Sequence, residues 1–103
     1  MNENDDKNWY WLKEKTKSAF VSTSSNYKQK ILYNLLNATK VGDQKRFFDI
    51  LYRAMAANLE NSKELAEKIS ELQSKTNKPQ DFEKFSYSII LGIMVSKNKQ
   101  GGN

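Results

Sequence analysis

The stretch YNLLNATKVGDQKRFFDILYR, from Tyr33 to Arg53, decides the fold. Its apolar residues recur at helical spacing on both sides of a Gly42-Asp43 break. Glycine is favoured just after a helix and aspartate is a preferred N-cap, so one helix ends and the next begins within a few residues. Because helices with so short a connection pack antiparallel, we predict an αα-hairpin with helices over about 26–39 and 43–59.

The rest of the chain also has a helical pattern, with one proline, four glycines and no clear period-2 alternation. We expect further helices over about 6–20, after a cap at Asn61 or Ser62, and over about 80–96, with Pro79 in the first turn of the last helix. In that last helix the residues expected to be buried are Phe82, Phe85, Ile89, Ile90, Ile93 and Met94. The prediction is an all-α, compact bundle of about five helices forming a single domain over 1–97, followed by a disordered tail over 98–103.

The composition argues against catalysis. The chain has no histidine and no cysteine, so the commonest metal ligand and the commonest general base at neutral pH are missing. The acids of the fourth helical segment alternate with lysines, which is typical of a solvated helix face: Glu60, Glu64, Glu67 and Glu71 with Lys63 and Lys68. We expect no enzyme activity, no cofactor, no metal and no small-molecule substrate.

No segment of the sequence has the pattern of a membrane anchor or a secretion signal. The longest apolar run, IILGIMV, has seven residues, whereas about 20 are needed to span a bilayer. The start, MNENDD, is polar and acidic, unlike the basic and then apolar start of a signal peptide. We therefore expect a cytoplasmic, soluble protein with no membrane partner.

Positive charge is concentrated in the first half of the chain. The net charge is +5, and residues 7–53 hold ten Lys and Arg against three acids. Such asymmetry favours a polyanionic partner, most often nucleic acid. The alternative is a basic domain whose charge only keeps it soluble.

On the helix over 26–39, one strip combines cations with an aromatic ring. The residues of this strip recur at i, i+3, i+7 and i+10: Lys30, Tyr33, Asn37 and Lys40. The strip lies away from the apolar side of the helix, which holds Tyr27, Ile31, Leu35 and Ala38. Such a strip can follow phosphates and stack on an unpaired base. The alternative is a solvated helix face with one exposed tyrosine.

Further cations stand on the neighbouring segments. Arg46 and Arg53 flank Asp49, which can pair with either and leave a positive excess. On the first helix Lys13 and Lys17 are four residues apart, a mildly unfavourable spacing for like charges unless an anion lies alongside. The candidate nucleic-acid-binding residues are Lys30, Lys40, Lys45, Arg46 and Arg53, followed by Lys13, Lys17 and Tyr33.

Two other features suggest close packing or an interface. Trp9, Tyr10 and Trp11 are consecutive, so they cannot all point inward from one helix. We assign Trp9 to the core and Tyr10 and Trp11 to a protein interface; the alternative is that Trp11 covers the end of the bundle. Gly92, inside an apolar helix, is expected to let another helix approach closely.

The hairpin sequence LYNLLNATKVGDQKRFFDILYR, Leu32 to Arg53, resembles the C-terminal region of the large subunit of type I CRISPR interference complexes (Cascade), especially subtype I-B. That region has an LLNA…GN…F-x-D-x-L-x-R pattern, followed by a late apolar helix that FSYSIILGI, Phe85 to Ile93, resembles. The matching hairpin residues are Leu35, Leu36, Asn37, Ala38, Gly42, Asp43, Phe47 or Phe48, Asp49, Leu51 and Arg53. The resemblance covers roughly residues 27–95.

A protein of this size is similar to the small subunit of such complexes, which in several subtypes is made from an internal start within the large-subunit gene. The resemblance implies a non-catalytic helical bundle present in more than one copy. Its expected partners are the large subunit, the backbone subunits, further copies of itself, the guide RNA and the target DNA. Its implied role is to stabilise the complex and to hold the displaced non-target DNA strand of the R-loop.

Two alternatives remain open on the sequence. The short connection at Gly42 permits a helix-turn-helix DNA-binding regulator, although Phe47 and Phe48 stand where a recognition helix would carry polar residues. A helical protein-protein adaptor whose basic strips bind an acidic protein is the second alternative.

Overall fold

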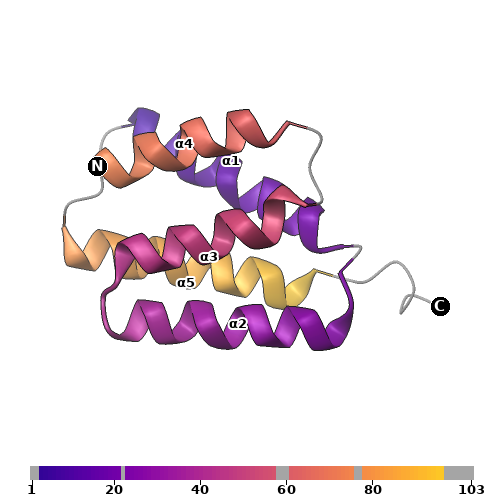
Figure 1. The fold of residues 1–103 in the computed structure, drawn as a ribbon. Helices are drawn as coiled ribbons and strands as arrows, with labels where there is room; N and C mark the ends of the chain where they lie inside the picture. Colours follow the sequence, from indigo (N-terminus) through magenta and orange to yellow (C-terminus); the bar gives the residue numbers. More distant parts are fainter. Residues whose placement is uncertain (1–2, 22, 58–60, 76–77, 97–103) are drawn as a thin grey trace.

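Five α-helices make up the described part of the chain, residues 3–21, 23–57, 61–75 and 78–96, in a computed structural model (Figure 1). No strand occurs in these residues, so the predicted all-α fold is confirmed. The helices are α1 (Glu3–Phe20), α2 (Ser25–Lys40), α3 (Gln44–Ala56), α4 (Ser62–Lys75) and α5 (Pro79–Val95).

The helices pack as a ring around one core. Each helix packs mainly against two others: α1 against α5, α5 against α2, α2 against α3, α3 against α4, and α4 against α1. In Figure 1, α2 and α3 lie side by side and antiparallel, with α5 behind them. The consequence for the surface is that α5 separates α1 from α2.

Aromatic side chains from three helices fill the middle of the ring. Phe47 meets Phe48 and Phe82 edge-on, each with ring centroids 5.5 Å apart, and Trp9 stacks on Phe85 at 4.8 Å. Edge-to-face and stacked pairs at these distances are favourable beyond the area they bury. Fully buried leucines complete the core: Leu12, Leu35, Leu51, Leu65 and Leu72.

The α2–α3 connection has the predicted stop and start. Gly42 has φ +73°, a left-handed conformation that glycine adopts without strain. The Gly42 N–H donates to the Thr39 carbonyl at 3.1 Å and the Asp43 N–H to the Ala38 carbonyl at 2.9 Å, which closes α2 with a Schellman motif. The Asp43 carboxylate then accepts from the Arg46 N–H at 3.1 Å and caps α3. The hairpin is confirmed.

Three further local predictions are confirmed. Asn61, rather than Ser62, caps α4, because its Oδ1 accepts from the Glu64 N–H at 3.2 Å. Pro79 begins α5. A Cβ built on Gly92 would lie 3.3 Å from Cγ of Lys17, so α1 does approach α5 closely at this glycine.

Other predictions need correction. Burial of Met94 is wrong: the residue is 59% exposed, because α5 turns Ile89, Ile90 and Ile93 inward and Met94 falls on its outer side. Tyr27, expected on the apolar side of α2, is also exposed. The third helix was expected to end at about residue 59, whereas α3 ends at Ala56 and residues 58–59 lie outside the described residues. The tail over 98–103 also lies outside them. None of the described helices has the length and apolar character required to cross a bilayer.

Candidate nucleic-acid interface

The net charge of the protein lies mainly on the α2–α3 hairpin. Residues 25–57 hold six Lys and Arg against two acids, whereas α1 and α4 each carry equal numbers of cations and acids. One of the two hairpin acids, Asp43, accepts a backbone hydrogen bond at the start of α3. The hairpin is therefore the strongly positive part of the described molecule, which favours contact with a polyanion.

The outer side of α2 carries the strip that the sequence predicts. Its inner side is buried through Ile31, Leu35 and Ala38. Lys30, Tyr33 and Lys40 are exposed on the other side, and Asn37 between them is half-buried. Tyr33 is 66% exposed, so its ring is free to stack on a flat partner such as a base.

The outer side of α3 adds three exposed cations. Phe47, Leu51 and Ala54 point into the core, while Lys45, Arg46 and Arg53 are exposed. Asp49 Oδ2 lies 3.4 Å from Arg53 Nε, in an ion pair whose side chains are mostly in solvent, and such exposed pairs contribute little. Within the described residues Lys45 and Arg46 form no ion pair, so the predicted positive excess is present on this side.

We call Lys30, Lys40, Arg46 and Arg53, with Tyr33, the basic face. The predicted Lys45 is exposed on the α4 side of α3, where it lines a cavity with Ala66 and Ser70, and does not belong to it. The residues of the basic face come together because α2 and α3 are neighbours in the ring and run antiparallel. Lys30 and Lys40 are ten residues apart, which is about 15 Å along a helix at 1.5 Å per residue. This length matches several phosphates of a nucleic-acid strand.

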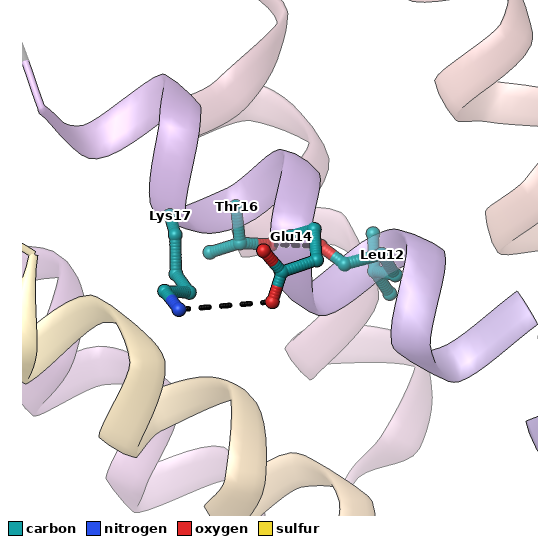
Figure 2. Close-up of polar contacts among 4 residues, drawn as sticks. All are labelled: Leu12, Glu14, Thr16 and Lys17. Atoms are coloured by element: carbon teal, nitrogen blue, oxygen red, sulfur yellow. Dashed lines mark hydrogen bonds and ion pairs between the residues drawn. The ribbon is translucent and has the colours of Figure 1, made fainter.

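Lys13 and Lys17 do not belong to the basic face. They are half-buried on the α5 side of α1, where their Cγ atoms lie 3.6 and 3.3 Å from the position of a Cβ on Gly92. Figure 2 shows Lys17 reaching the carboxylate of Glu14, with Nζ 3.6 Å from Oε2. Because α5 stands between α1 and α2, Lys13 and Lys17 form a group separate from the basic face.

The two aromatic residues predicted at an interface also have different surroundings. Tyr10 is 66% exposed beside α5. Trp11 is half-buried and packs against the core, with the ammonium groups of Lys15 and Lys68 at 5.6 and 5.8 Å from its ring centroid. The α1–α4 contact near Trp11 is polar: Lys68 donates to Asn8 Oδ1 at 3.2 Å, and the Asn8 amide donates to Glu71.

One basic residue near the basic face, Lys78, was not predicted from the sequence. Lys78 precedes α5 and lines, together with Lys40, an open cavity of about 530 Å³ at the end of the bundle where α2 ends and α5 begins. Lys78 is 38 residues after Lys40 in the sequence, and only the packing of α5 against α2 brings the two together. Lys78 thus adds a second cation beside Lys40, and the carboxylate of Glu83 lines the same cavity and offsets part of this charge.

The described residues provide no metal centre at this site, and no relative was found that assigns it a function. In the part of the chain that the structure describes, no three acidic, histidine or cysteine side chains gather as a metal site would require. Comparisons with protein-family models, with curated proteins and with solved structures give no match to this chain.

Proposed function

We propose that this protein is a non-catalytic nucleic-acid-binding subunit that holds a sugar-phosphate backbone on the basic face. The observation that carries the proposal is the exposed strip of cations on α2 and α3, of which only Arg53 is paired with an acid among the described residues. Lys and Arg that neutralise phosphates bind without sequence preference, and an exposed tyrosine adds sequence-tolerant stacking.

Within this class, we propose the small subunit of a type I CRISPR interference complex, which holds the displaced non-target DNA strand of the R-loop. This finer assignment rests on the resemblance of residues 27–95 to the C-terminal region of the large subunit. The chemistry is compatible with it, because guide pairing reads the sequence and a strand-holding protein needs only backbone contacts and stacking. The partners would be the other proteins of the complex, the guide RNA and the target DNA.

The packing of the hairpin disfavours a helix-turn-helix regulator. In that motif the two helices cross steeply and the second exposes base-reading side chains. Here α2 and α3 lie antiparallel along their lengths, and Phe47 and Phe48 are buried in the core. A duplex-specific footprint would nevertheless favour the regulator over the present proposal.

The test is the salt dependence of single-strand binding. We would follow fluorescence anisotropy of a labelled oligo-dT between about 50 and 200 mM salt, for the wild type and for Lys30→Ala/Lys40→Ala/Arg46→Ala. Each lost phosphate contact lowers the slope of log K against log salt by about 0.7 for single strands. The triple variant should therefore bind more weakly, with a slope smaller by about 2.

A charge-matched control separates the basic face from net charge. Lys63→Ala/Lys75→Ala/Lys84→Ala also removes three positive charges, but from α4 and α5. It should leave the salt slope close to that of the wild type. An unchanged salt slope in Lys30→Ala/Lys40→Ala/Arg46→Ala would contradict the assignment of the basic face. An equal loss of affinity in this variant and in the control would contradict it as well.

The Cascade assignment has its own test. A tagged copy expressed in a host with the neighbouring genes should co-purify with guide RNA, with backbone subunits and with a large subunit. Recovery of the tagged copy alone, or together with other proteins but without RNA, would refute this assignment. Neither result would affect the single-strand binding test.

A further inference from the structure

A row of apolar side chains on α5 faces solvent. Tyr87, Leu91, Met94 and Val95 follow each other at i, i+4, i+7 and i+8, and the last three are 56%, 59% and 60% exposed. Single exposed apolar residues are ordinary on protein surfaces, but a row on one helix face marks an interaction site. We call these four residues the α5 stripe.

A small cavity adjoins the α5 stripe in the groove between α1 and α5. It measures about 170 Å³ and is lined by Trp9, Tyr10, Lys13, Phe85, Ser88 and Ile89. Its polar groups are the hydroxyls of Tyr10 and Ser88 and the ammonium group of Lys13, and no carboxylate lines it. Lys13 forms no ion pair within the described residues.

Trp9, one of the lining residues, has an unpaired buried donor. Its side chain is 2% exposed, and its Nε1–H has no acceptor among the described residues. A buried indole N–H usually has a hydrogen-bond partner, so an orphan of this kind calls for an explanation. Tyr10, Lys13 and Ser88 thus supply the cavity with donors, and no anionic acceptor stands among its lining residues.

The cavity and the α5 stripe form one continuous surface. Ser88 lies in the cavity and is three residues before Leu91 on the outer side of α5. Ser88 and Val95 are separated by seven residues, or about 10 Å and two helical turns. Lys17, one turn after Lys13 on α1, borders the second of these turns beside Gly92.

We infer that this surface docks an amphipathic helix of a partner protein. The partner presents two turns of apolar side chains, at i, i+3 or i+4, and i+7, to the α5 stripe and an Asp or Glu to the cavity beside Lys13. Charge complementarity selects this occupant. A second copy that met this surface with its own would bring no carboxylate from the cavity walls to Lys13, and a nucleic acid has no apolar row to cover Leu91 and Met94.

The docking surface goes beyond nucleic-acid binding, because it lies on α5 and α1 rather than on the basic face. The probe is a display library of helical peptides about four turns long, selected against the folded protein. We expect enrichment of peptides with the apolar spacing above and at least one acidic residue. A synthetic copy of an enriched peptide should bind the Leu91→Asp variant at least about tenfold more weakly than the wild type.

Charge reversal identifies the acidic contact. Lys13→Glu should weaken the same peptide about tenfold, and the peptide with its acidic residue changed to Lys should regain affinity for Lys13→Glu alone. The control is Val41→Asp, which places an acid at another exposed apolar residue, at the end of α2. It should bind the peptide as the wild type does, and circular dichroism should show all three variants folded.

Several outcomes would overturn the inference. No enrichment, enrichment of basic peptides, or peptides that bind Leu91→Asp and the wild type equally would each refute a docked acidic helix. A wild-type dimer in sedimentation equilibrium that Leu91→Asp converts to monomer would assign the surface to a second copy instead. Loss of oligo-dT binding in Leu91→Asp as large as that in Lys30→Ala/Lys40→Ala/Arg46→Ala would assign it to nucleic acid.

Discussion

Replacing Gly92 by alanine tests how closely α1 approaches α5. Alanine is favoured over glycine inside a helix by about 1 kcal/mol. The added Cβ would lie 3.3 Å from Cγ of Lys17 and 3.6 Å from Cγ of Lys13, so the first contact is a few tenths of an ångström too short. Both atoms belong to flexible side chains, and the Lys17 side chain is 40% exposed, so it can move aside at small cost. We expect a net stabilisation of about 0.5 kcal/mol.

The assay is urea unfolding followed by circular dichroism, with Ser70→Ala on the exposed side of α4 as a calibration of helix propensity alone. Gly92→Ala should raise the midpoint, and a thermal melt should shift upward by about 2–4 °C. Gly92→Leu should instead destabilise by about 1–3 kcal/mol, because its branches reach past the lysine stems into α1. Destabilisation of about 1 kcal/mol or more by Gly92→Ala would show that rigid atoms, not lysine side chains, occupy this contact.

Three further predictions concern the hairpin. Gly42→Ala should cost about 1–2 kcal/mol in the free energy of unfolding, although a Cβ there meets nothing within 4 Å, because its φ of +73° is unfavourable for alanine; an unchanged urea midpoint would refute this. Leu51→Ala, at a fully buried residue, should cost about 2–5 kcal/mol in the same assay, and less than about 1 kcal/mol would contradict the core described. Asp49→Asn should release Arg53 and tighten oligo-dT binding at about 50 mM salt, with a smaller gain at about 200 mM; weaker binding would argue against the basic face.

The hairpin could be predicted from the sequence because its signals are local. The hydrogen bonds of Gly42 and Asp43 that end α2 and begin α3 join residues close in the sequence. The neighbouring residues were therefore enough to predict both helix ends. The outer strip of α2 followed from the same helical period that buries Ile31 and Leu35. Exposure of Lys30, Tyr33 and Lys40 is the simple complement of that burial.

The features that the sequence could not predict depend on how helices meet. IILGIMV is apolar on every side of α5, so its periodicity could not show that Met94 faces solvent while Ile93 is buried. The sequence also could not separate Lys13 and Lys17 from the basic face, because that separation exists only through the insertion of α5 between α1 and α2. Lys78 joins Lys40 for the same non-local reason.

The most direct test of the basic face is an NMR titration of the labelled protein with oligo-dT at low salt. Our account predicts that the largest amide and side-chain shifts fall on the outer sides of α2 and α3, around Lys30, Tyr33, Lys40 and Arg46, and that they diminish as salt is added. Shifts confined to α4 or to the α5 stripe, or no shifts at about 50 mM salt, would contradict it.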